Sequence, residues 1–361
     1  MTSRSLLFLS AAASLFAVRA QAASVPEGFS DRLIAQGITS PTALTVLPDG
    51  RVLVAQQNGE ILLIKDDRPD ADTFWKVPNV DSTFERGCMG IVPDPSFRSN
   101  HYLYLYCSII SADDSEVSNN KVLRVTEADG KVVSGSVLEL LSLPPVTSIF
   151  HMGGALRFAP DGSLLLAVGN QEDEPEPPET ATSQDLTSPF GKMLRIRADG
   201  SVPDDNPFRD RSGAYGPIWS YGYRNPFAFD IQPGTGRVFV GDVGQGSWEE
   251  VNEDVRGGNY GWPQVEGPSD DERFSTPFFA YKHNDERCAI TGAAFYNPPA
   301  SQFPDGYVGK FLFEDFCGGT IERLDPTTAQ VSPSSPESVS PPTSRSHPMA
   351  ASITWRAIKT R

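Results

Sequence analysis

The segment PDGSLLLAV at residues 160–168 shows the pattern that decides the fold of this 361-residue chain. Proline fixes φ and the following Asp and Gly favour a tight turn, after which a short apolar run is typical of a buried strand. Related turns begin at Pro48, Pro93, Pro233 and Pro304, each before a strand-like run. A unit that recurs at intervals of 45 to 73 residues predicts a β-propeller with several short strands per blade. Two β-sandwiches with coincidental hairpins are the alternative.

The composition supports a β-rich chain and limits its partners. The 31 glycines and 31 prolines indicate many tight turns, and a content of 39% hydrophobic and 21% charged residues excludes general disorder. The 46 Asp and Glu residues outnumber the 30 Lys and Arg residues, so the net charge is −16. Because phosphate binding needs clustered cations, we expect no nucleic-acid partner.

The first residues have the pattern of an export signal. Arg4 precedes an apolar run over residues 6–18, and Ala20-Gln21-Ala22 has the form of a signal-peptidase site. The run is too short to span a bilayer comfortably, and no other stretch is long and apolar enough. We therefore expect a signal peptide at residues 1–22 and a secreted protein with no membrane span; a buried N-terminal helix is the alternative.

Four cysteines in an exported chain favour two disulfides. Of the three possible connectivities we expect the sequential one, Cys88 with Cys107 and Cys288 with Cys317, because each pair flanks strand-like runs. A zinc site is not expected, since the chain has no Cys-x-x-Cys spacing and only four histidines.

Three segments contain residues that could bind a ligand. His151 precedes a Gly-Gly pair whose backbone can approach a ligand closely, and Arg224 lies beside Asn225 in a pattern that suits a planar anionic partner. Residues 241–252 combine carboxylates with glycine-rich loop carbonyls, the ligands that calcium prefers. Each segment alone has a structural interpretation as well, such as an arginine that caps strand carbonyls. The absence of a G-x-S-x-G motif argues against a serine hydrolase.

The order of several motifs resembles the glucose/sorbosone dehydrogenase family, the sugar dehydrogenases that use pyrroloquinoline quinone. The resemblance covers about residues 25–325 and is carried by residues 85–91, 93–97, 151–154, 191–196, 199–207, 223–226 and 257–263. It implies an all-β fold, a six-bladed β-propeller over residues 25–326, with quinone and sugar at one end of the central channel. Residues 327–361 form a Ser- and Pro-rich segment unlike the family, so we expect an atypical tail and an incomplete last blade.

The resemblance also implies roles in catalysis. His151 corresponds to the general base that takes the proton of the sugar's anomeric hydroxyl while hydride passes to the quinone, a role that suits imidazole near neutral pH. Arg224 and Asn225 correspond to residues that contact the cofactor and stabilise charge on its carbonyl oxygen. An external electron acceptor would complete the reaction.

Two calcium sites are implied in the same way. Gly244 and Gln245 occupy the positions whose backbone carbonyls hold a cofactor-contacting calcium. Glu250, the Tyr260 carbonyl and Asp270 occupy the positions that hold a second, structural calcium. Oxygen ligands of this kind suit calcium.

Three departures from the family pattern bear on activity. Asn170 stands where the quinone enzymes have an Asp that orients the catalytic His, and it cannot stabilise an imidazolium by charge. Cys317 stands where they use a Lys to bind a quinone carboxylate, and Glu85 replaces a Gln near the cofactor. The alternative function is therefore a non-catalytic secreted β-propeller that binds a glycan or a protein partner.

Overall fold

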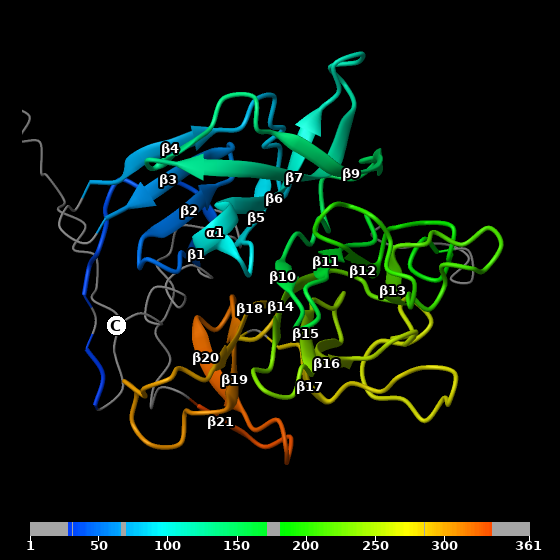
Figure 1. The fold of residues 1–361 in the computed structure, drawn as a ribbon. Coiled ribbons are helices and arrows are strands. Elements are labelled where there is room, and N and C mark those ends of the chain that lie inside the picture. The colour runs from blue at the N-terminus through cyan, green and yellow to red at the C-terminus, as the bar shows by residue number, and fades with distance from the viewer. Residues whose placement is uncertain (1–27, 31, 66–69, 172–180, 285, 334–361) are drawn as a thin grey trace, which may run out of the picture.

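Antiparallel sheets account for nearly all the regular structure of the computed structural model, which describes residues 28–30, 32–65, 70–171, 181–284 and 286–333 (Figure 1). The first two sheets are formed by β1 (Pro41–Val46), β2 (Val52–Gln56), β3 (Glu60–Ile64) and β4 (Asp72–Lys76), then by β5 (Cys88–Pro93), β6 (Tyr102–Ile110), β7 (Ser118–Ala128), β8 (Lys131–Val132) and β9 (Leu138–Pro145). The third is formed by β10 (Leu156–Phe158), β11 (Leu164–Val168), β12 (Lys192–Ile196) and β13 (Ile218–Tyr221). The fourth is formed by β14 (Pro226–Ile231), β15 (Val238–Asp242), β16 (Trp248–Asp254) and β17 (Phe279–Lys282), and the fifth by β18 (Ile290–Tyr296), β19 (Lys310–Asp315), β20 (Thr320–Leu324) and β21 (Val331–Pro333).

Within each sheet, consecutive strands of the chain are neighbours, except that β9 pairs with β7. The turns expected from the sequence connect the first strand of a sheet to the second. The turn at Pro160–Gly162 lies between β10 and β11, and the one at Pro48–Gly50 lies between β1 and β2. Gly162 and Gly50 both adopt positive φ, 81° and 92°, which explains the glycine at the end of each turn.

The five sheets follow one another around a central cavity (Figure 1). Residues of the first strand of every sheet, β1, β5, β10, β14 and β18, line this cavity. Apolar side chains fill the space between successive sheets; for example, Leu53 of β2 packs in one buried cluster with Ile91 of β5. The fold is therefore an all-β propeller. The described residues contain five blades, so the expected sixth blade is not confirmed.

Two expectations concern residues at the ends of the chain. The signal peptide predicted at residues 1–22 lies outside the described residues. Of the predicted tail, 327–361, the first residues include β21, which pairs with β20 as the fourth strand of the fifth sheet, and residues 334–361 lie outside the described part. The helix of the described part, α1 (Phe97–Asn100), has four residues, and no described helix could cross a bilayer.

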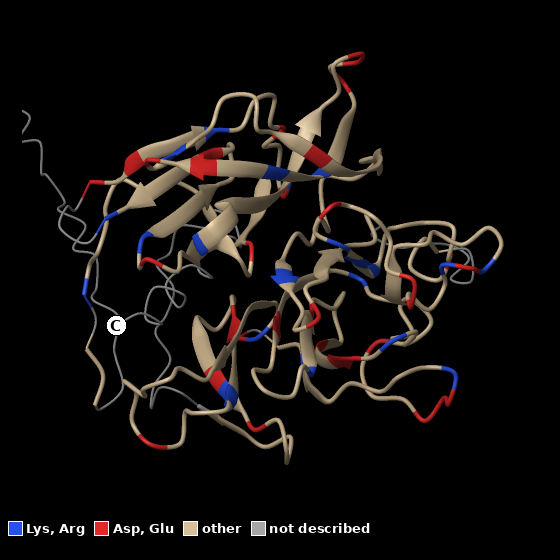
Figure 2. Ribbon diagram, in the orientation of Figure 1, with Lys and Arg blue, Asp and Glu red and all other residues tan. Residues whose placement is uncertain are grey.

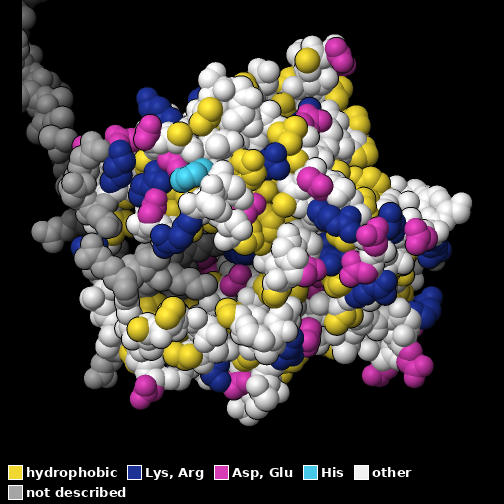
Figure 3. Space-filling model, viewed as in Figure 1, with side chains coloured by type: hydrophobic (Ala, Val, Ile, Leu, Met, Phe, Trp, Pro, Cys, Tyr) yellow, Lys and Arg dark blue, Asp and Glu magenta, His cyan; other side chains and the backbone are white. Residues whose placement is uncertain are grey.

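Charged residues are distributed over all the sheets and their loops (Figure 2). On the face shown in Figure 3, Lys and Arg side chains alternate with acidic and apolar ones and form no continuous basic surface on the described residues.

Candidate active site

The predicted site residues come together because of strand direction. In an antiparallel pair, the start of one strand lies beside the end of the next. The register places Pro226 opposite Asp242 and Ile290 opposite Asp315, so loops that precede a first strand and loops that follow a second strand meet at the same end of each blade. The candidate catalytic and cofactor-binding residues all lie in these loops.

His151 lies in the loop between β9 and β10 and is held on two sides. Its backbone N–H donates to Glu85 Oε2 at 2.8 Å, and its ring nitrogen Nδ1 lies 2.7 Å from Asn170 Oδ1. His151 is 5% exposed and Asn170 is fully buried. The structure thus brings together three predicted residues from three different loops.

Asn170 connects this histidine to the arginine of the next blade. The Asn170 backbone N–H donates to the Arg224 carbonyl at 2.8 Å, and the Asn170 carbonyl accepts a bond from the Thr182 hydroxyl at 2.9 Å. Asn170 follows β11 and Arg224 precedes β14, so these contacts fix the third blade against the fourth at the candidate site.

Asp242 at the end of β15 holds the Arg224-Asn225 pair. Its carboxylate accepts the backbone N–H of Arg224 at 3.0 Å and that of Asn225 at 2.7 Å. Burial, together with the nearby Glu250, raises the pKa of Asp242 above its usual range. The Arg224 guanidinium donates through Nη1 to the Val243 carbonyl at 3.1 Å and the Gly244 carbonyl at 2.8 Å, and lies 5.5 Å from the centre of the Trp262 ring.

The side-chain oxygen of Asn225 indicates that this site can take a ligand. Asn225 is 4% exposed, and its buried Oδ1 has no hydrogen-bond partner among the described residues. A buried polar atom without a partner costs free energy unless another group satisfies it. A ligand with hydrogen-bond donors or a bound cation would fit there.

Two carboxylates that sequence reasoning missed hold the loop that contains Gly244 and Gln245. Glu266 Oε1 accepts four consecutive backbone N–H groups, those of residues 245–248, at 2.9–3.1 Å. Burial disfavours the charged form of Glu266, but these backbone bonds prevail and its pKa is lowered. Glu249 Oε1 accepts the N–H of Gly244 at 3.2 Å.

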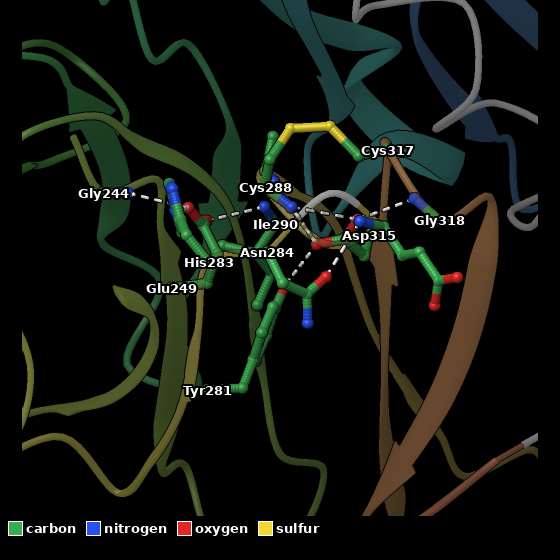
Figure 4. The surroundings of a disulfide bond; sticks show 12 residues. Gly244, Glu249, Tyr281, His283, Asn284, Cys288, Ile290, Asp315, Cys317 and Gly318 are labelled. Carbon is green, nitrogen blue, oxygen red and sulfur yellow. Dashed lines mark hydrogen bonds and ion pairs between the residues drawn. A yellow bond between two sulfur atoms is a disulfide. The ribbon is translucent and has the colours of Figure 1, made fainter. Parts of the chain in front are cut away.

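Glu249 also connects the fourth blade to the fifth (Figure 4). Its Oε2 accepts the N–H of Ile290 at 2.8 Å, and its Oε1 contacts His283 Nε2. Burial raises the pKa of Glu249 to about 7, and the hydrogen bond to Glu249 raises the pKa of His283. No local motif predicts the contact between Glu249 and His283, because the two residues lie 34 positions apart in the sequence.

Both predicted disulfides are present. Cys88 and Cys107 join the paired strands β5 and β6, and Cys288 and Cys317 join the loops at the ends of β18 and β19. Figure 4 shows the second disulfide close to Asp315, which accepts the Cys288 N–H at 3.1 Å and the Gly318 N–H at 2.9 Å. Cys317 is therefore part of a covalent link at the end of the blade where the loops of the candidate site lie.

The residues predicted for a second calcium site are not joined by contacts of their own. Glu250 is buried and its two oxygens accept bonds from the Gly267 N–H at 2.6 Å and the Asn252 amide at 2.9 Å, whereas Asp270 is exposed. Within the described ranges, no three His, Cys, Asp or Glu residues form a group that could hold a metal.

The sequence pattern of the glucose/sorbosone dehydrogenase family matches residues 38–334. The chain belongs to this family. It is 29% identical over 268 residues to quinoprotein glucose dehydrogenase B of Acinetobacter calcoaceticus. This alignment covers 69% of the present chain and 55% of that protein. The chain thus spans about half the length of that relative. It is 28% identical over 303 residues to aldose sugar dehydrogenase YliI of Escherichia coli K12, which covers 80% of this chain and 78% of the relative.

A solved structure supports the relationship in three dimensions. The pyrroloquinoline quinone-bound form of aldose sugar dehydrogenase from Streptomyces coelicolor superposes with a TM-score of 0.69 at 27% identity, covering 84% of this chain and 83% of that one. Relatives of this family member therefore include sugar dehydrogenases, among them one solved with the quinone bound.

Proposed function

We propose that this chain is an exported aldose dehydrogenase that uses pyrroloquinoline quinone and calcium and has His151 as its general base. The sugar dehydrogenases among its relatives support the reaction class. The observation that carries the proposal is the 2.7 Å contact between His151 Nδ1 and Asn170 Oδ1, in a site that also holds Arg224 and Asn225.

This contact defines the chemistry that the imidazole can perform. An amide oxygen only accepts hydrogen bonds, so the proton of the neutral ring lies on Nδ1 and the lone pair lies on Nε2. A positioned Nε2 lone pair can accept the proton of the anomeric hydroxyl of an aldose. Glu85 holds the backbone N–H of the same residue, so Asn170 positions the ring while Glu85 positions the main chain that carries it.

Arg224, Asn225 and the carbonyls of Gly244 and Gln245 are the residues that would hold the cofactor and its calcium. Their donor set fits an anionic quinone and an oxygen-ligated cation, and the buried Asn225 Oδ1 lacks a partner among the described residues. When bound, the quinone would accept the two electrons that leave the anomeric carbon. The guanidinium of Arg224 would then stabilise negative charge beside it.

The proposed location outside the cytoplasm agrees with the cysteines. All four are in disulfides, and such bonds persist in oxidising compartments. Export itself remains a proposal from the N-terminal sequence; mass determination of the protein recovered from its host would identify the first residue.

Reconstitution tests the proposed reaction. Purified protein is titrated with pyrroloquinoline quinone and calcium, and dye reduction is followed with a panel of aldoses. We expect turnover that His151→Ala abolishes while quinone affinity changes little. Absence of both quinone binding and turnover would overturn the proposal. That result would favour the non-catalytic glycan- or protein-binding propeller, an alternative that Asn170 supports because it lacks the charge of an Asp.

A further inference from the structure

We propose that Glu266 is a positioning residue, whose carboxylate turns the carbonyls of Gly244 and Gln245 toward the cofactor side of their loop. This inference rests on the proposed function, because those carbonyls are the proposed calcium ligands. It adds a residue to which the resemblance assigned no role.

The contacts of Glu266 form a closed arrangement. One carboxylate oxygen, Oε1, accepts the backbone N–H groups of Gln245, Gly246, Ser247 and Trp248 at 2.9, 3.1, 3.0 and 3.1 Å. Consecutive N–H groups that converge on one point form a nest, an anion-binding concavity. Here the chain supplies the anion from a residue about twenty positions away.

Because the peptide unit is planar, the direction of each of these N–H groups fixes the direction of the carbonyl in the same unit. The N–H of residue 245 belongs to the same peptide unit as the carbonyl of Gly244, and in a trans peptide the two point in opposite directions. A Gly244-Gln245 unit whose N–H points at Glu266 therefore directs the Gly244 carbonyl away from it. The same argument applies to the Gln245 carbonyl, through the N–H of Gly246.

The contact of the Gly244 carbonyl agrees with a direction away from Glu266. Gly244 O accepts the Arg224 guanidinium at 2.8 Å, so it does face the candidate cofactor site. The loop is also closed tightly: a Cβ at Gly244 would lie 1.8 Å from the Trp248 carbonyl and 2.7 Å from Glu266 Oε1. Little room therefore remains for the loop to rotate its peptides without breaking the bonds to Glu266.

Replacing the carboxylate tests the inference in the protein without bound cofactor. Calcium affinity is measured by isothermal titration for wild type, Glu266→Ala and Glu266→Gln, with thermal unfolding of each variant as a check on folding. We expect Glu266→Ala to weaken calcium binding about 10- to 100-fold, the range for residues that orient metal ligands, and Glu266→Gln to weaken it less. Millimolar formate, a small carboxylate that can refill the nest, should restore part of the lost affinity in Glu266→Ala alone.

Glu253→Gln is the matched control, since Glu253 of β16 is paired with Arg237, which directly precedes β15, and makes no bond to the loop. Wild-type calcium affinity retained in Glu266→Ala would overturn the inference and leave the proposed function intact. A wild-type protein that binds neither calcium nor quinone would overturn the proposed function and this role together. Amide hydrogen exchange of residues 245–248 then still reports whether the carboxylate holds the loop.

Discussion

Gly169 lies directly against the backbone of His151: a Cβ built on Gly169 would be 1.9 Å from the His151 carbonyl oxygen and 2.5 Å from its carbonyl carbon. Both neighbours are backbone atoms, so no side chain can turn away to make room. The position of the candidate base therefore depends on the absence of a side chain at residue 169.

Gly169→Ala is expected to displace His151 and to lower dehydrogenase activity about 100-fold, since a shift of about 1 Å in a catalytic group can cost that much. The measurement is the rate of dye reduction with saturating quinone and sugar. Gly216→Ala is the control, because its nearest neighbour would be 3.7 Å from the new Cβ. Equal activity of the two variants would show that the His151 backbone position is not required.

Asn170→Asp should raise the rate of sugar oxidation. A carboxylate at the Nδ1 side would stabilise the imidazolium formed when His151 takes a proton, and the loss of such a charge costs about 10⁴ in a related His-Asp arrangement. We expect at least about a tenfold increase in kcat and a higher pKa in the acidic limb of the pH–rate profile. A variant with an unchanged profile would mean that His151 does not become charged in the rate-limiting step.

The effect of Glu314→Gln on the free energy of unfolding should be more favourable at alkaline pH than at acid pH. Burial and the neighbouring Asp315 raise the pKa of Glu314 from 4.5 to about 7, and its Oε2 has no hydrogen-bond partner among the described residues. The folded state thus retains a proton that the unfolded chain loses, so the stability from this group is complete below pH 4.5 and is lost as the pH rises through 7.

Glutamine at residue 314 removes this dependence. The difference in unfolding free energy between variant and wild type should shift in favour of the variant by on the order of 2 kcal/mol from about pH 5 to about pH 8. Urea unfolding at several pH values measures it, with the exposed Glu116→Gln as control. A pH-independent difference would contradict the proposed protonation of Glu314.

Replacing both Cys88 and Cys107 by Ser should lower the free energy of unfolding by about 2–4 kcal/mol. The disulfide closes the hairpin of β5 and β6 across 19 residues, and both cysteines are fully buried. Guanidinium unfolding measures the effect, and a reductant should destabilise wild type more than the double variant. Equal sensitivity to the reductant would show that this bond does not contribute to stability.

The blades were predictable from the sequence because their signals are local. The turn at Pro160–Gly162 and the run 163–168 needed only proline geometry and an apolar strand, and the structure places them between β10 and β11. Each of the five turns found in the sequence lies between the first two strands of one of the five described blades, whereas the sixth blade, which only the family resemblance implied, is not confirmed.

The site was predictable only in part, because some of its residues stand in local motifs and others are joined only by contacts between distant loops. His151, Arg224 and Asn225 stand in short motifs that resemble the family's, whereas the contacts of Glu266 and of Glu249 with His283 arise only when distant loops meet. The residues around Glu266 do not predict its contacts, because the donors are backbone N–H groups of residues 245–248. Nearly every residue type has such a group, so the sequence does not show which ones converge.

Because the strands of each blade are consecutive in the chain, biosynthesis and folding can proceed in the same direction. The first sheet is complete at Lys76, before the second begins at Cys88. Hairpins form in about 1–10 μs, whereas ribosomes add about 5–20 residues per second, so the strands of one blade can pair before those of the next exist. Each disulfide also joins cysteines at neighbouring strands of a single blade. Oxidation of the second blade therefore does not depend on the fifth, and each disulfide can form once its own blade has been synthesised.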